Sequence, residues 1–106
     1  MDARAIEAFL RMIEDGKDSA MLRYGLGTAY LQQENFAQAV EHLGKAVELD
    51  PQYSAAWKNY GKALTADGQK HPAVQAYERG IDVAESRGDK QAVKEMRVFL
   101  KRLKKN

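Results

Sequence analysis

The sequence contains no cysteine, which excludes a disulfide framework, a cysteine-bound zinc site and a thiol nucleophile. Only two prolines and eight glycines interrupt 106 residues, and this favours long helices over many short strands. No apolar run approaches the roughly 18 residues of a membrane span, and the N-terminus has no basic segment followed by an apolar one. These absences predict a soluble cytoplasmic protein with a single domain over residues 1–106.

The net charge of +2 is unevenly distributed along the chain. Residues 87–106 hold eight basic and two acidic residues, whereas residues 1–86 hold nine basic and thirteen acidic ones. A basic end can bind an acidic partner, nucleic acid included, or the body of a second copy. The simpler interpretation is the solvated outer face of a terminal helix.

Apolar residues recur at the three- and four-residue spacing of helices along nearly the whole chain, with no alternation typical of strands. Asp18 or Ser19 is expected to cap the second helix, and Asn35 with Gln38 to form a capping box at the start of the third. Gly16 is expected to end the first helix. The predicted helices cover residues 2–15, a segment after Ser19, the segment from Asn35 to Pro51, residues 54–66, a segment from Pro72 to about Gly88, and residues 89–104.

A shift of 34 residues superimposes the middle of the sequence on itself. Four identities fall on positions expected to face the core: Gly27 with Gly61, Ala29 with Ala63, Ala39 with Ala73, and Val40 with Val74. Such a match indicates a duplicated helix hairpin. The small residues are expected where the two helices of each hairpin cross, because a larger side chain there would hold the backbones apart.

These residues resemble the tetratricopeptide repeat, a helix–turn–helix unit of 34 residues. In the first full unit, residues 20–53, the pattern is carried by Leu26, Gly27, Tyr30, Ala39, Leu43, Ala46 and Pro51, with Arg23 in place of the leading tryptophan. In the second, residues 54–87, it is carried by Trp57, Tyr60, Gly61, Leu64, Gly68, Ala73 and Tyr77, with departures at Gly80 and Glu85. The resemblance implies an all-α, right-handed α-solenoid of about six antiparallel helices, with an N-terminal helix over 2–15 and a capping helix over 89–104.

The resemblance also implies a non-catalytic scaffold for protein–protein interaction, whose concave groove holds a peptide segment or a partner's helix. The groove positions would be Met21, Tyr24, Thr28 and Leu31 in the first unit and Ala55, Lys58, Asn59, Lys62 and Thr65 in the second. This part apolar, part basic surface suits an acidic and hydrophobic segment. Two alternatives stay open: Lys58 and Lys62 as a solvated pair one helical turn apart, and Tyr24 as a residue packed on the first helix.

One subclass of the family grips the C-terminal carboxylate of chaperone tails with lysine and asparagine side chains. The equivalent positions here are Tyr24 and Thr28 on the first groove helix, Asn59 on the second, and Asp89 and Val93 on the third. Only Asn59 matches that subclass. The resemblance therefore does not extend to a carboxylate clamp.

Nothing in the sequence has the pattern of a catalytic or metal site. His42, expected to be partly exposed, and His71, expected at a helix start, are far apart and have no metal-binding spacing. The Gly25-Leu26-Gly27 segment lacks the strand and the third glycine of a dinucleotide site. We therefore predict that the chain is not an enzyme and holds no cofactor or metal.

Two other kinds of binding are alternatives to the groove. The basic stripe of the last helix could bind nucleic acid, but no aromatic interleaves it and the pI is near 8.9, so this alternative is less favoured. The stripe consists of Lys90, Lys94, Arg97, Lys101 and Lys104. Self-association through the first helix is the third possibility, and the apolar face of the last helix is expected to cover Tyr77 and Ile81. The expected state is a monomer or a weak homodimer, without membrane contact.

Overall fold

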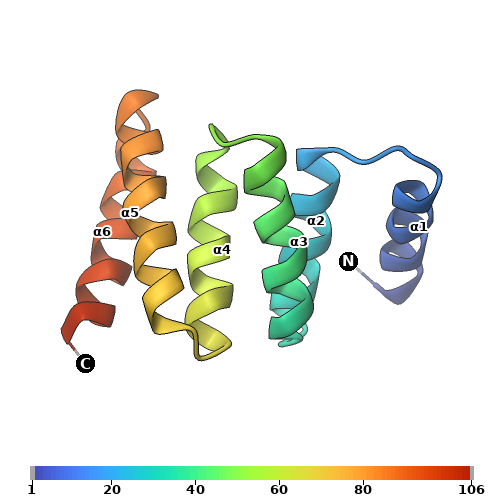
Figure 1. Ribbon diagram of the computed structural model, residues 1–106, viewed down its shortest axis with the longest axis horizontal. Helices are drawn as coiled ribbons and strands as arrows, with labels where there is room; N and C mark the ends of the chain where they lie inside the picture. The colour runs from blue at the N-terminus through green and yellow to red at the C-terminus, as the bar shows by residue number, and fades with distance from the viewer. Residues whose placement is uncertain (1, 106) are drawn as a thin grey trace.

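The computed structural model describes residues 2–105, which form six α-helices and no strand. The helices are α1 (Ala3–Glu14), α2 (Ala20–Gln32), α3 (Phe36–Leu49), α4 (Ser54–Ala66), α5 (Lys70–Ser86) and α6 (Lys90–Lys105). They stand side by side along the longest dimension of a body measuring 40 × 28 × 19 Å, with α1 at one end and α6 at the other (Figure 1). The all-α prediction is confirmed. None of the helices within residues 2–105 has the length and apolar character needed to cross a membrane.

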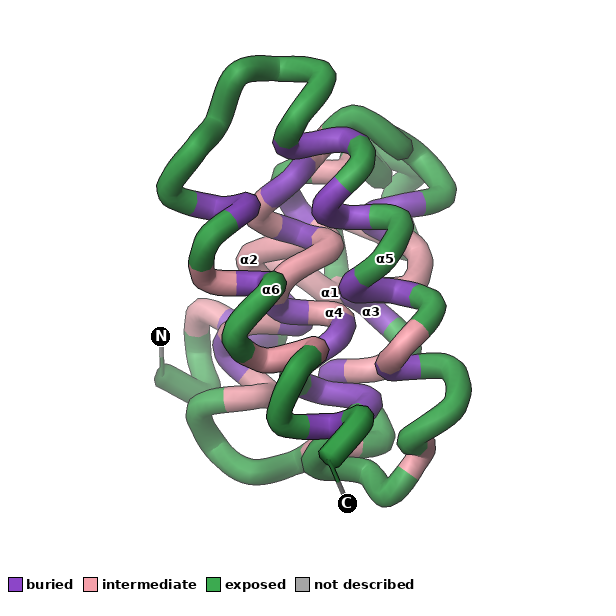
Figure 2. Tube along the Cα trace, turned by 90° about the vertical axis from the view of Figure 1, so that its left-hand side faces the viewer, coloured by how far each residue is buried: buried purple, intermediate pink, exposed green. Residues whose placement is uncertain are grey.

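The helices form two layers, because successive pairs pack as antiparallel hairpins (Figure 2). One layer contains α2, α4 and α6, in which α4 contacts both of the others. The other layer contains α3 and α5, which have no Cα atoms within 8 Å of each other. The closer spacing in the first layer makes the array curve toward it. We call the face formed by α2, α4 and α6 the inner face.

Two glycines let the helices of each hairpin approach closely. A Cβ atom on Gly27 would lie 2.9 Å from Leu43 Cδ2 and 3.0 Å from its backbone nitrogen. A Cβ on Gly61 would lie 2.5 Å from Tyr77 Cε1. Because Leu43 and Tyr77 are buried, each hairpin depends on the absence of a side chain at its glycine.

The helix starts differ in whether a side chain caps them. Asp2 and Ser19 have ψ angles of 177° and 159°, and their side-chain oxygens accept hydrogen bonds from Ala5 N at 3.0 Å and Leu22 N at 3.1 Å. The capping box predicted for Asn35 and Gln38 is wrong, because the Asn35 side chain makes no capping hydrogen bond. Its ψ of 78° departs from the extended geometry that aims a side chain at the free amides, and Glu34 before it has φ 60°.

The last helix departs from the 34-residue period. Helix α4 begins at Ser54, 34 residues after α2 begins at Ala20, but α6 begins 36 residues after α4, at Lys90. The difference arises because α5 has 17 residues where α3 has 14, while the segment after α5 (87–89) is one residue shorter than the segment after α3 (50–53). Met96 of α6 is fully buried and belongs to the same core cluster as Tyr77 and Ile81, so the expected cover of these two residues by α6 is confirmed.

Candidate functional site

The nine residues predicted for the groove all lie on α2 and α4 of the inner face. Their surroundings differ widely. Met21 is 75% exposed, whereas Asn59 is 8% exposed. Leu31 is half-buried and packs against the cluster of Ala39, Leu43 and Ala63.

Polar contacts join the first helices of the units across the middle of the inner face. Asn59 Nδ2 donates to Thr28 Oγ1 at 3.1 Å and to Tyr24 Oη at 3.3 Å, which ties α4 to α2. Lys58 Nζ donates to Glu95 Oε1 at 3.2 Å, which ties α4 to α6. Four of the predicted residues therefore take part in these hydrogen bonds. Each of these contacts satisfies a polar group at a helix junction.

Tyr24 does not pack on the first helix, as one of the two alternatives supposed. The centre of its ring lies 4.8 Å from that of Tyr53, a residue of the segment that joins α3 to α4. Tyr24 is not among the residues that pack around α1. The other alternative treated Lys58 and Lys62 as solvated. In the structure Lys58 pairs with Glu95, and Lys62 Nζ lies 5.7 Å from the centre of the Phe99 ring.

Two hollows flank these central contacts. At the end where α2 and α4 begin, Met21 and Ala55 line a hollow of about 560 Å³ together with Tyr53 and Arg87. At the opposite end a hollow of about 340 Å³ lies between α4 and α6. Its lining is Lys62, Thr65, Ala66, Tyr77, Phe99, Arg102 and Leu103.

The hollow between α4 and α6 combines an apolar wall with positive charge. Phe99 and Leu103 supply apolar surface, and the exposed cations Lys62 and Arg102 belong to opposite helices. A cation above an aromatic ring is held by the electron-rich ring face, worth about 0.5–1 kcal/mol at an exposed site. Phe99 and Arg102 were not among the predicted groove residues, because the 34-residue period covers only the first two units. The three-residue spacing of these two residues on α6 places them on one side of the helix and could have indicated them.

The two-residue offset of α6 also changes which of its residues correspond to the clamp positions of the carboxylate-binding subclass. The 34-residue period had placed these positions at Asp89 and Val93. Asp89 precedes α6, where its Oδ1 accepts a hydrogen bond from Ala92 N at 3.1 Å, and Val93 is buried. Measured from the start of the helix, the equivalent residues are Gln91 and Glu95. Neither is a cation, so the corrected register adds no match to that subclass.

His42 is buried at 5% exposure, so the expectation that it is partly exposed is wrong. The guanidinium of Arg23 lies 3.1 Å from His42 Nδ1, and the Tyr30 ring stacks on the imidazole at 5.5 Å. Burial and, next, the charge of Arg23 lower the pKa of His42. Asp18 holds the same guanidinium through two hydrogen bonds of 2.8 and 2.9 Å. Arg23 therefore has a structural role where the repeat pattern has tryptophan.

Within residues 2–105 no group of three or more histidine, aspartate or glutamate side chains could hold a metal ion. His71 is exposed at the start of α5, distant in sequence from the buried His42. The chemistry offered by the inner face is apolar contact, hydrogen bonding and positive charge.

Comparison with known proteins agrees with this arrangement of helices. The tetratricopeptide repeat family model matches residues 20–53. A TPR repeat-containing protein of Pseudomonas aeruginosa, PA0015, is 50% identical over 92% of this chain and 93% of its own length. The chain belongs to the tetratricopeptide repeat family.

Solved structures extend the comparison to three dimensions. The solution structure of BPP2914 from Bordetella parapertussis has a TM-score of 0.81 at 45% identity, over 99% of this chain and 90% of that one. The second TPR domain of human RPAP3, in complex with the HSP70 peptide SGPTIEEVD, has a TM-score of 0.80 at 33% identity, over 97% of this chain and 81% of that one. These similarities confirm the predicted solenoid of helix hairpins.

Proposed function

We propose that this chain is a non-catalytic protein–protein interaction scaffold whose inner face binds a segment of a partner protein. The segment carries acidic and hydrophobic residues and lies across α4 and α6. The observation that carries the proposal is the hollow of about 340 Å³ where Phe99 and Leu103 lie beside the cations Lys62 and Arg102. The peptide complex of the related RPAP3 domain supports a binding role for this fold.

The chemistry of the hollow determines which segment it suits. An apolar side chain of the partner would contact Phe99 and Leu103, while a neighbouring carboxylate would pair with Lys62 or Arg102. Lys58 is a weaker candidate because Glu95 already neutralises it. Met21, which is 75% exposed, would extend the contact toward α2.

We expect micromolar affinity, about −8 kcal/mol, because few repeats contribute to a short groove. The probe is a fluorescein-labelled synthetic peptide in which two leucines are flanked by glutamates, measured by anisotropy. Lys62→Glu combined with Arg102→Glu should weaken binding by about tenfold or more, since it replaces attraction by repulsion at both sides of the hollow.

The matched control is Lys105→Glu, an equal kind of charge reversal on an exposed residue of α6 outside the hollow. It should keep nearly the wild-type affinity. Circular dichroism should show the same helicity and thermal midpoint for all three proteins. Equal binding by the double variant and the wild type, or no binding by the wild type, would contradict the assignment of the inner face.

A further inference from the structure

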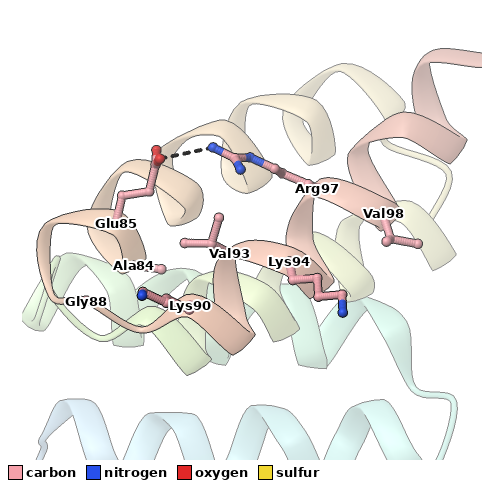
Figure 3. Close-up of a pocket in the computed structure, with 8 residues that line it drawn as sticks. All are labelled: Ala84, Glu85, Gly88, Lys90, Val93, Lys94, Arg97 and Val98. Atoms are coloured by element: carbon pink, nitrogen blue, oxygen red, sulfur yellow. Dashed lines mark hydrogen bonds and ion pairs between the residues drawn. The ribbon is translucent and has the colours of Figure 1, made fainter.

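A separate hollow of about 550 Å³ opens at the α6 end of the array, outside the inner face. It is lined by Ala84, Glu85, Gly88, Lys90, Val93, Lys94, Arg97 and Val98 (Figure 3). Its residues on α6 follow one another at three- and four-residue spacing, on the side of the helix opposite Phe99. The hollow is therefore distinct from the one that Phe99 lines between α4 and α6.

Helices α2, α4 and α6 are the first helices of successive units, so the α6 residues that line the hollow can be compared with residues at the same helix positions in α2 and α4. The eighth residue is Gly27 in α2, Gly61 in α4 and Arg97 in α6. Gly27 faces Leu43 of α3 and Gly61 faces Tyr77 of α5, so in both complete hairpins this position contacts the second helix.

The fourth residue of each first helix gives the same result. Arg23 contacts His42 of α3, and Trp57 lies under Arg79 and beside Gly80 of α5. The equivalent residue of α6, Val93, lines the hollow instead. The hollow thus occupies the place of the second helix of a third unit, and no helix within residues 2–105 fills it.

The lining of the hollow defines what can fill that place. Val98, which is 45% exposed, supplies the accessible apolar surface, and the buried residues Val93 and Ala84 lie behind it at the base of the hollow. Lys90 and Lys94 have no acidic partner among the residues that the structure describes, and Arg97 donates to Glu85 at 3.0 Å. An occupant must therefore bring apolar side chains together with carboxylates.

We propose that this end hollow is a docking site for an amphipathic acidic helix of a partner protein. The helix lies where the second helix of a hairpin would lie and sets its apolar residues on the exposed Val98, with glutamates or aspartates toward Lys90 and Lys94. Arg97 stands at the position of the close-approach glycines and keeps the partner helix farther from α6 than α3 is from α2. The acidic helix of another protein fits better than α1 of a second copy, because the exposed acids of α1, Glu7 and Glu14, are offset by the exposed cations Arg4 and Arg11.

The test uses the 106-residue chain and a synthetic helical peptide with leucine at every third or fourth position and glutamate at the solvent-facing ones. Titration calorimetry should show binding to the wild type. Lys94→Glu should weaken it by about tenfold or more through charge, and Val98→Trp should do so by filling the hollow without changing charge. Lys105→Glu and the inner-face pair Lys62→Glu with Arg102→Glu should bind as the wild type does.

Four outcomes would overturn the proposal. They are unchanged binding to Val98→Trp and Lys94→Glu, equal binding of a peptide whose leucines are replaced by glutamine, tighter binding of a duplex oligonucleotide than of the peptide, and no binding to the wild type. Sedimentation equilibrium adds a further decisive result. A wild-type dimer that Val98→Trp converts to a monomer would assign the hollow to a second copy and so overturn the proposal of a different partner.

Discussion

Replacing Gly61 by alanine tests whether the close approach of α4 and α5 holds the second hairpin together. The added Cβ would lie 2.5 to 2.7 Å from three atoms of the Tyr77 ring. That ring is 2% exposed and packs among the buried residues of the largest core cluster, so moving it away from Gly61 disrupts its core packing. The contact must be relieved by separating the helices or displacing the ring.

The expected effect is a difference between two opposing terms. Overpacking of this severity costs about 3 kcal/mol, while alanine gains about 1 kcal/mol over glycine in a helix interior, leaving a loss of about 2 kcal/mol. A loss of that size lowers the thermal midpoint by roughly 8–16 °C in a domain of this size. Urea unfolding followed by circular dichroism at 222 nm measures the free energy directly.

Gly44 provides the matched control within the same fold. A Cβ there would lie 3.3 Å from atoms of Tyr60, a half-buried residue, so Gly44→Ala needs only a small adjustment. Its strain and its helix-propensity gain should nearly cancel, leaving stability within about 0.5 kcal/mol of wild type. If Gly61→Ala were as stable as Gly44→Ala, the packing argument for the hairpin would be refuted.

Three further predictions follow from single features. Glu34→Gly should raise the free energy of unfolding by about 1 kcal/mol in urea titrations, because Glu34 holds φ 60° in a turn where the next hairpin has Gly68 at φ 79°; an unchanged midpoint would count against this strain. The free energy of unfolding should be level from pH 8 to 7 and fall below about pH 6.5. Burial lowers the pKa of His42, so in this range the unfolded chain binds a proton that the folded chain does not. His42→Gln should flatten the decline in the free energy of unfolding between about pH 6.5 and 5. The peptide SGPTIEEVD and its C-terminally amidated form should bind equally weakly in calorimetry, because Tyr24 and Thr28 offer no positive charge to a terminal carboxylate; a tenfold loss on amidation would show a clamp after all.

The helices could be predicted from the sequence because their signals are local. Apolar spacing predicted α4 at Ser54–Ala66, and Gly16 with Ser19 marked the boundary between α1 and α2. The pairing of hairpins followed from small residues recurring 34 positions apart. Such features need no knowledge of what lies across the core.

The environment of individual side chains could not be predicted in the same way. His42 lies one position from the apolar stripe, and its burial depends on Arg23 and Tyr30 from another helix. Asn59 resembles a ligand-binding residue in sequence, yet its amide binds Tyr24 and Thr28. Partners brought together by folding decide both cases.

The register of α6 shows how a small change in length moves a prediction to the wrong face. Two residues correspond to roughly 200° around a helix, so a fixed 34-residue period points to nearly the opposite side of α6. The fixed period therefore places Val93 at the position of a groove cation, although Val93 is buried against the core. The longer α5 that causes the shift has no separate mark in the sequence beyond the missing proline at Glu85.

The cross-links at Asn59 and Glu95 have a consequence for how binding energy is used. They join the parallel helices α2, α4 and α6 in the unbound protein, so the inner face should keep its curvature when no partner is bound. The partner segment would then lose nearly all of the conformational entropy that binding costs. Rigidifying that segment, rather than this protein, would therefore be the effective way to raise the affinity.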